Sequence, residues 1–199
     1  SEGANSAGLA LAGVLPHRGP GGVPVAKAGK NLLEMLAQPL AGLLLLNIEP
    51  EHDCAEGGAA VTALKSAGFV VALTPYLSPA LAAHADVVLP VGTFAETAGT
   101  FVNCEGRWQG FGGVAAPVGA SRPAWKVLRV LGNLLNIPDF DYNSAEEISA
   151  VVRAVSAAVQ PDNTVTATAI PPAATAVDIV VGDLEVPMYG ADGIVRRAA

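Results

Sequence analysis

Three short apolar runs constrain the fold of this chain more than any other feature. They are Leu40–Pro50 (LAGLLLLNIEP), Phe69–Leu73 (FVVAL) and Asp86–Leu89 (DVVL). Within each run, apolar residues follow one another instead of alternating with polar ones. That pattern is typical of strands buried on both faces of a parallel sheet, because neither face meets solvent. We therefore predict three buried parallel strands.

The segments between these runs have helical patterns. Residues 59–67 place Ala60, Val61 and Leu64 on one face, and Gly68 follows as a C-terminal cap. Residues 78–85 form the crossover to the third strand. A strand–helix–strand–crossover–strand order predicts an α/β fold, a Rossmann-like parallel sheet flanked by helices.

Ligands in sheets of this kind bind beyond the carboxyl ends of the strands. Asn47–Cys54, Thr74–Ser78 and Pro90–Gly99 directly follow the three predicted strands. We expect these segments to converge at one edge of the sheet.

The following residues add a hairpin or irregular extension at Thr100–Phe111 and two amphipathic helices. The first helix spans Trp125–Leu135, with Pro123 at its first turn and Asn136 and Pro138 at its end. Its apolar face is Val127, Leu128, Leu131, Leu134 and Leu135. The second begins at an S-x-x-E capping box, Ser144 with Glu147. Its predicted buried stripe is Ile148, Val151, Val152 and Val155.

The chain divides into three predicted parts. Residues 1–159 form the α/β domain, which opens with a small-residue helix over 1–15 and has a short helix at 32–37. Residues 160–177 are low in charge and rich in Thr, Ala and Pro, which is typical of a linker. Residues 178–199 form a tail with a strand near 178–181 and a helix over 191–198.

Charge and composition exclude several classes of protein. The formal charge is −7 and the basic residues are scattered, whereas nucleic-acid binding needs a basic stripe. The apolar runs are shorter than the ~18 residues of a membrane span, and no signal peptide is evident. Two cysteines, Cys54 and Cys104, make no disulfide framework and favour a reducing, cytoplasmic compartment.

Hydrophobic residues make up 51% of the chain and charged residues only 15%, against a usual charged share of about 25%. One interpretation is that part of the surface is normally covered by other polypeptide, so that the isolated chain self-associates. A codon bias toward Ala and Gly is the alternative.

Metal and nucleotide sites are poorly supported by motif spacing. The acidic cluster between Glu49 and Glu56 lacks paired spacing such as C-x-x-C and predicts a solvated loop rather than a zinc site. Two cysteines do not fill an iron–sulfur cluster, which usually takes four. The glycines at 19, 21 and 22 lack the GK[ST] ending of a P-loop and the strand–GxGxxG–helix context of a dinucleotide site.

A dense polar loop follows the third strand. Within a dozen positions it holds Glu96, Gly99, Thr100, Asn103 and Arg107. Functionally, such a loop could grip an anionic or pterin-like ligand through side chains and backbone N–H groups. Structurally, Glu96 could instead accept hydrogen bonds from the backbone of its own loop, with the glycines making turns.

The pattern ADVVLP…E-x-x-GT-x-x-N-x-EGR-x-Q across this loop resembles the molybdopterin oxidoreductase superfamily, in which the loop lies near the bis-pterin cofactor. Two further segments resemble the superfamily, EGANSAG at Glu2–Gly8 and NIEP at Asn47–Pro50. The matched positions in the loop are Ala85, Asp86, Leu89, Pro90, Glu96, Gly99, Thr100, Asn103, Glu105, Gly106, Arg107 and Gln109.

Two segments narrow the resemblance to the large iron–sulfur subunits of bacterial NADH-quinone oxidoreductases (complex I). These are RPAWKVLRVLGNLL at Arg122–Leu135 and VPMYGADGIVRRAA at Val186–Ala199. The resemblance implies a C-terminal segment of such a subunit, with iron–sulfur clusters bound upstream and no cofactor, catalytic residue or metal ligand here. It implies the rest of the subunit and the other subunits of the hydrophilic arm as partners, on the cytoplasmic side of the inner membrane and without insertion into it.

One departure from the superfamily is Asn47, which stands where cofactor-binding members have Gly, and no Cys is placed to ligate molybdenum. Glu96, Gly99, Thr100, Asn103 and Arg107 are therefore candidates for a vestigial pterin loop. Three hypotheses remain: a non-catalytic structural module, a segment of an active molybdopterin enzyme such as a formate dehydrogenase, and a free-standing nucleotide-binding domain.

Overall fold

The computed structural model describes residues 3–159 and 192–198. Contacts divide the chain into two units, Ser1–Val159 and Gln160–Ala199. The predicted linker at 160–177 and the predicted strand near 178–181 lie outside the described residues. Of the helix predicted over 191–198, the described residues contain only a single 3-10 turn, η3 (Val195–Arg197). All the other helices and strands described below belong to the first unit.

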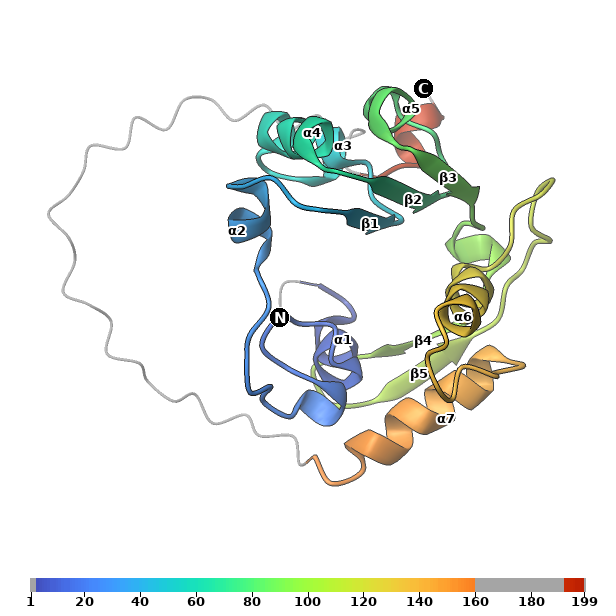
Figure 1. Ribbon diagram of the computed structural model, residues 1–199. Coiled ribbons are helices and arrows are strands. Elements are labelled where there is room, and N and C mark those ends of the chain that lie inside the picture. Colours follow the sequence, from blue (N-terminus) through green and yellow to red (C-terminus); the bar gives the residue numbers. More distant parts are fainter. Residues whose placement is uncertain (1–2, 160–191, 199) are drawn as a thin grey trace, which may run out of the picture. The chain divides into compact units, whose positions relative to one another are not determined.

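The three predicted strands form a parallel sheet, as the apolar runs predict (Figure 1). The strands β1 (Leu43–Leu46), β2 (Val70–Thr74) and β3 (Val87–Pro90) follow one another in the order β1-β2-β3. Leu43 pairs with Val70, and Val71 pairs with Val87. The predicted α/β class is confirmed.

Helices α4 (Gly57–Ser66) and α5 (Pro79–His84) cover one face of this sheet (Figure 1). Leu64 from α4 and Leu81 from α5 meet Val70 and Ala72 of β2 in the buried core. The predicted crossover is α5, which begins where the Ser78 hydroxyl accepts a hydrogen bond from the Leu81 N–H at 3.3 Å. This apolar layer positions the carboxyl ends of the strands.

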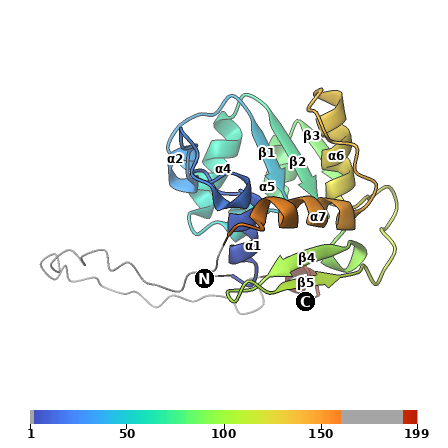
Figure 2. The ribbon, with the colours of Figure 1, turned by 90° about the horizontal axis from the view of Figure 1, so that it is seen from below.

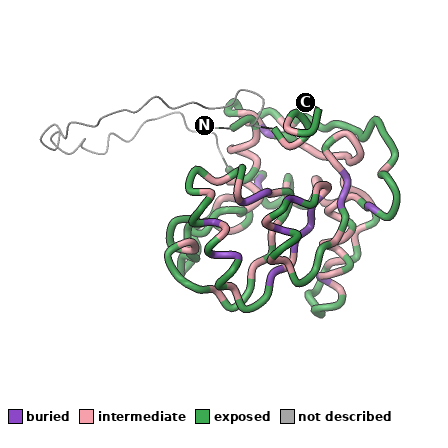
Figure 3. The backbone as a smooth tube through the Cα atoms, turned by 90° about the horizontal axis from the view of Figure 1, so that it is seen from above, coloured by how far each residue is buried: buried purple, intermediate pink, exposed green. Residues whose placement is uncertain are grey.

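Burial on both faces holds only for the central strand. Leu73 and Ala72, on opposite faces of β2, are both fully buried. In β1, by contrast, Leu44 and Leu46 are 53% and 45% exposed and alternate with half-buried neighbours. The prediction is wrong for β1 because this strand lies at the sheet edge and only one of its faces is covered. Figure 3 shows the buried residues as short stretches in a largely exposed or intermediate backbone.

Gly68 does not cap α4. The helix ends at Ala67 in an extended conformation, with φ −68° and ψ 143°. A Cβ atom on Gly68 would lie 2.7 Å from the Ala41 carbonyl oxygen, and the Gly68 N–H donates to the Leu40 carbonyl at 2.9 Å. The glycine is needed because two chain segments approach closely here. The prediction that Gly68 is a special position is right, but its predicted role as a helix cap is wrong.

The extension after the sheet is a β-hairpin, one of the two forms predicted. Strands β4 (Gly99–Val102) and β5 (Trp108–Phe111) pair antiparallel. The N-terminal helix α1 (Ser6–Ala12) is shorter than predicted because Gly13, at φ 77°, ends it. Asn5, just before α1, accepts a hydrogen bond from the Val102 N–H at 2.8 Å and so fastens the hairpin to the N-terminal segment.

Helices α6 (Ala124–Leu134) and α7 (Ala145–Ser156) follow the hairpin (Figure 2). α6 ends at Leu134, and Asn136, the predicted stop, follows its C-cap with φ 55°. Leu134 and Leu135, on its predicted apolar face, are 75% and 63% exposed. Parts of its apolar face therefore have no cover in this unit. Within the described residues, no helix has both the length and the apolar content that a membrane span requires.

Only half of the stripe predicted for α7 is covered. Val151 and Val155 are 45% and 47% exposed, whereas Ser156 is buried. The capping box is half formed, because the Ser144 hydroxyl accepts from the Glu147 N–H but the Glu147 carboxylate accepts from the Asn143 N–H. Ile148 and Val152 of the predicted stripe are half-buried and line the pocket against the hairpin and α1, whereas the two other valines turn outward.

The remaining elements are short. They are η1 (Pro20–Gly22), α2 (Leu32–Leu36), α3 (Pro50–Asp53) and η2 (Phe94–Glu96). The predicted helix at 32–37 is α2, which begins at a complete capping box between Asn31 and Glu34.

Candidate functional site

The segments that follow the three strands meet at one edge of the sheet, as predicted. The Glu51 Oε1 atom of α3 accepts a hydrogen bond from the Ala80 N–H of α5 at 3.0 Å. The Val91 N–H donates to the Thr74 carbonyl at 3.3 Å. The carboxyl edge is therefore closed by contacts between its own loops.

The Glu51 carboxylate of this edge is held by several hydrogen bonds. Burial raises its pKa, but hydrogen bonds with the Ser78 hydroxyl and with the N–H groups of Glu51 and Ala80, and the nearby His52, lower it further than burial raises it. The pKa of Glu51 thus lies below its ordinary value, and the group is ionised at neutral pH. The Glu51 Oε2 atom is buried and has no hydrogen-bond partner of good geometry. The Ser78 hydroxyl nevertheless lies close enough to the carboxylate to lower its pKa.

Asn47 occupies a special backbone position at the end of β1. Its φ is 50°, in the left-handed region that favours glycine and that Asn tolerates better than other residues. Its N–H donates to the Leu73 carbonyl at 2.8 Å. The position therefore requires a residue that accepts positive φ, and Gly and Asn both satisfy that requirement. Asn47 argues neither for nor against a cofactor.

The acidic cluster after β1, predicted to be a solvated loop, contains the short helix α3. Glu49 is only 4% exposed, and its N–H donates to the Asp53 carboxylate at 2.7 Å. Burial, with a smaller effect of Asp53, raises the pKa of the Cys54 thiol, which favours its protonated form. Among the described residues no group of three or more His, Cys, Asp or Glu side chains is arranged to hold a metal ion.

Glu96, the first candidate of the polar loop, binds backbone of its own surroundings. Its Oε2 accepts from the Thr93 N–H at 2.7 Å and the Thr93 hydroxyl at 3.0 Å, and its Oε1 accepts from the Val118 N–H at 2.9 Å. The bonds from the Thr93 backbone and hydroxyl lower the pKa of Glu96, with a smaller contribution from Val118, against an opposing effect of burial. The carboxylate fastens η2 to the chain before α6.

Asn103 and Arg107 lie at the turn of the hairpin. The Asn103 Oδ1 accepts from the Glu105 N–H at 3.1 Å and the Arg107 N–H at 2.9 Å. Gly106 supplies the positive φ that the turn requires, 76°. The Arg107 guanidinium is exposed and donates no hydrogen bond to any residue that the structure describes.

Gly99 and Thr100 lie at the other end of the hairpin, against α7. The Thr100 and Ser149 hydroxyl oxygens are 3.3 Å apart, within hydrogen-bond distance. A Cβ atom on Gly99 would lie 2.6 Å from the Phe111 ring, so glycine is needed for the two strands to close. The hairpin thus separates the five candidates into two groups, Glu96 with Gly99 and Thr100 at one end and Asn103 with Arg107 at the other.

Two pockets beside the hairpin include the predicted loop residues Gly99 and Thr100, but the rest of their walls was not predicted from the sequence. An apolar pocket of about 230 Å³ between the hairpin, α1, α6 and α7 is lined by Trp108, Trp125 and Ile148, among others. An adjoining groove of about 470 Å³ contains Thr100, Ser149 and Arg153. The Arg153 guanidinium lies 4.9 Å from the centre of the Trp108 ring. No local pattern marks these pockets, because their walls come from segments distant in the chain.

Comparisons with known proteins agree with the sequence resemblance. The family model described as molybdopterin oxidoreductase matches residues 7–134, almost two-thirds of the chain. The G subunit of the NADH-quinone oxidoreductase of Mycobacterium tuberculosis is 37% identical over 131 residues, covering 54% of this chain and 16% of the relative. This chain therefore spans about one-sixth of that relative's length.

Two further relatives come from different enzymes. The mitochondrial NADH-ubiquinone oxidoreductase 78 kDa subunit of Candida albicans is 44% identical over 55 residues, 28% of this chain and 8% of the relative. The F420-dependent formate dehydrogenase subunit alpha of Methanocaldococcus jannaschii is 38% identical over 95 residues, 47% of this chain and 14% of the relative.

Proposed function

The chain belongs to the molybdopterin oxidoreductase family, and from this premise we propose that it is a non-catalytic structural module of the large iron–sulfur subunit, the G subunit, of an NADH:quinone oxidoreductase. In this role it carries no electrons itself. It supports a subunit whose upstream part holds the iron–sulfur clusters, within the hydrophilic arm of a membrane-bound respiratory complex. Its partners are the rest of that subunit and the neighbouring subunits of the arm.

The observation that carries this proposal is the use of the polar loop. Both carboxylate oxygens of Glu96 are engaged: Oε2 accepts a hydrogen bond from Thr93, and Oε1 accepts one from Val118. Asn103 closes the hairpin turn, and Thr100 pairs with Ser149 of α7. These side chains stabilise the local fold, so the loop motif has a structural role without any ligand.

The loop is a poor fit for the pterin cofactor that the family name implies. A pterin needs several converging donors and acceptors, whereas Glu96 and Asn103 already use their acceptor oxygens within the chain. They also lie at opposite ends of the hairpin. Arg107 alone among the charged candidates keeps its guanidinium available.

The relatives include both candidate kinds of enzyme. The NADH-quinone oxidoreductase relative is matched over 54% of this chain and the formate dehydrogenase over 47%. The difference is small, so a segment of an active molybdopterin-dependent formate dehydrogenase is the second candidate. The observation in favour of this second candidate is the 38% identity to a formate dehydrogenase subunit.

Metal and pterin content of the native protein distinguishes the two candidates. The full-length protein is purified from its own cells, its molybdenum, tungsten and iron are measured by mass spectrometry, and pterin is assayed by fluorescence after oxidation. For a structural module of the iron–sulfur subunit we expect iron without molybdenum, tungsten or pterin, and copurification with NADH dehydrogenase activity. Molybdenum or tungsten near one per chain, with pterin and formate oxidation, would establish the second candidate instead.

A further inference from the structure

A groove between α6 and the loop before α7 combines cations with aromatic rings. It is about 240 Å³ in volume. Trp125, Lys126, Arg129 and Val130 of α6 line one side, and Tyr142 and Asn143 line the other. This second side lies beyond residue 134, where the family match ends. The groove is therefore independent of the polar loop and of the proposed function.

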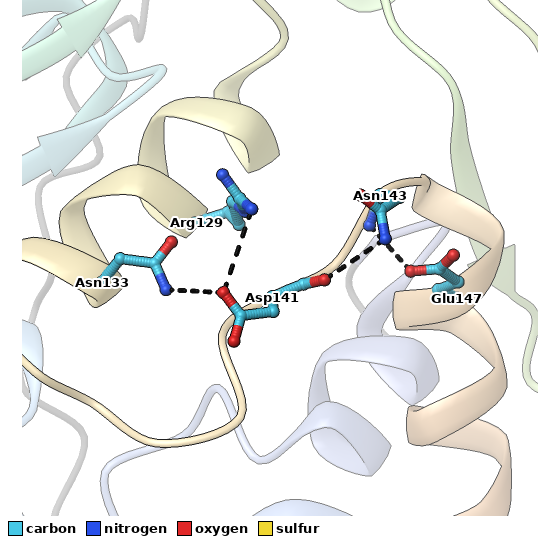
Figure 4. Close-up of polar contacts among 5 residues, drawn as sticks. All are labelled: Arg129, Asn133, Asp141, Asn143 and Glu147. Atoms are coloured by element: carbon cyan, nitrogen blue, oxygen red, sulfur yellow. Dashed lines mark hydrogen bonds and ion pairs between the residues drawn. The ribbon is translucent and has the colours of Figure 1, made fainter.

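Arg129 is the unusual residue of this groove. Its Nη2 atom is 3.9 Å from the Asp141 Oδ1, too far for a hydrogen bond (Figure 4). Its Nε atom is buried and has no hydrogen-bond partner. The side chain is 34% exposed, so water reaches only part of it. None of its five N–H donors is matched by an acceptor among the described residues.

The nearby acidic side chains are engaged elsewhere. The Asp141 Oδ1 accepts from the Asn133 amide at 3.1 Å, and the Asp141 side chain is 85% exposed (Figure 4). The Glu147 Oε2 accepts from the Asn143 N–H at 2.7 Å. Each carboxylate fixes the loop between the helices, and neither satisfies the Arg129 guanidinium.

A guanidinium with unmade hydrogen bonds in a partly buried position is costly, and a planar anion removes that cost. Carboxylate and phosphate oxygens match the guanidinium fork, and the Lys126 ammonium lies one turn away on the same groove wall. Trp125 and Tyr142 add aromatic surface to the groove, and the Lys126 ammonium lies 5.3 Å from the centre of the Trp125 ring. Aromatic surface of this kind favours another ring.

We propose that this groove binds a small anion in which a carboxylate or phosphate is joined to an aromatic ring. The anionic group pairs with Arg129, with Lys126 adding charge, and the ring lies against Trp125 and Tyr142. Binding replaces the loose contact between Arg129 and Asp141. A ring without the anion leaves Arg129 unpaired, and the anion without a ring loses the apolar contact, so both parts are required.

Calorimetric titration of the full chain tests the site with simple probes. Benzoate and phenyl phosphate represent the carboxylate and phosphate sources, benzyl alcohol is the neutral ring, and inorganic phosphate is the anion without a ring. We expect one or both aromatic anions to bind, and the two controls to bind at least about tenfold more weakly.

Variants assign the binding to this groove. R129Q should weaken binding of the aromatic anion about tenfold or more, and R129K should also weaken it because ammonium lacks the bidentate fork. K65Q, which removes an exposed lysine from α4, should leave binding unchanged. Thermal melting of each variant confirms that it is folded, and Y142A provides a second test if R129Q is not.

Three results would overturn the proposal. The first is absence of binding by both aromatic anions at millimolar concentration. The second is binding of benzyl alcohol as tight as that of benzoate. The third is undiminished affinity in R129K and in whichever of R129Q and Y142A remains folded. None of these results depends on the metal content of the native protein.

Discussion

Replacing Gly132 with alanine should destabilise the protein, although the same change in most helices is favourable. Gly132 lies within α6 and is buried. Glycine in a helix interior is about 1 kcal/mol less favourable than alanine. Helix propensity alone therefore expects G132A to stabilise the fold by about that amount.

Packing against Phe140 reverses this expectation. A Cβ atom on Gly132 would lie 2.1 Å from the Phe140 Cδ1 and 2.6 Å from its Cε1, far inside the ~3.5–4.0 Å of ordinary carbon contact. The ring must move, and it also contacts Tyr142, at 6.3 Å between ring centres. Overpacking of this kind costs about 1–3 kcal/mol, and loss of half-buried ring surface adds to it. After the gain in propensity, we expect a net loss of about 1–2 kcal/mol.

Urea unfolding followed by circular dichroism measures this change, provided that the slope with denaturant is the same in all variants. G58A is the matched control, because Gly58 is also helical and a Cβ atom added there would meet no atom within 4 Å. We expect G58A to be neutral or to stabilise by up to about 1 kcal/mol.

A double-mutant cycle isolates the contact with the ring. In an F140A background the obstruction is gone, so G132A should stabilise by about 0.5–1 kcal/mol. The sign of the G132A effect should therefore reverse between the two backgrounds. If G132A stabilises the wild-type chain as G58A does, Phe140 does not pack closely over α6 and the expected cost of overpacking is wrong.

Three further perturbations test other parts of the fold. E96Q should melt at a lower temperature than wild type at neutral pH, because a carboxylate with a lowered pKa stabilises the fold only while it is ionised. The difference in melting temperature should close as the pH falls from about 4.5 through the lowered pKa of folded Glu96. A difference that does not change with pH would contradict this. N47A should destabilise by about 1 kcal/mol and N47G should not, because the cost lies in positive φ; equal urea midpoints for the two variants would refute the backbone explanation. Light scattering over a concentration series should show that the chain self-associates. The L134E variant should associate less, because the Leu134 side chain is 75% exposed. A monomer at every concentration would indicate that the apolar composition reflects codon bias.

The sequence alone determined the order and type of the central elements. Continuous apolar runs at Leu43–Leu46 and Val70–Thr74 form paired parallel strands, and Ser78 begins the crossover helix as its pattern indicates. These features depend on local periodicity, on caps and on the burial of apolar side chains, all of which are written in neighbouring residues. The motif of the polar loop likewise identified the family.

Tertiary structure decided which apolar faces are covered. Leu44 and Leu73 both lie in apolar runs, yet the first is 53% exposed and the second is fully buried. Burial depends on whether a strand is central or at an edge and on what packs above it, and this information is distributed over the whole chain. The same reason explains why Val151 of α7 faces outward although its helix was correctly predicted.

Tertiary structure also decided the roles of individual site residues. The sequence placed Glu96 in a polar loop, but only the fold shows that its second oxygen binds Val118, a residue 22 positions away. It marked Gly68 as special, but the close approach of Ala41 is the cause. The buried Arg129 Nε without a hydrogen-bond partner had no sequence signal at all, because it depends on the distance to a loop beyond the helix end. Local patterns fix what each segment becomes, and contacts between distant segments fix what each side chain does.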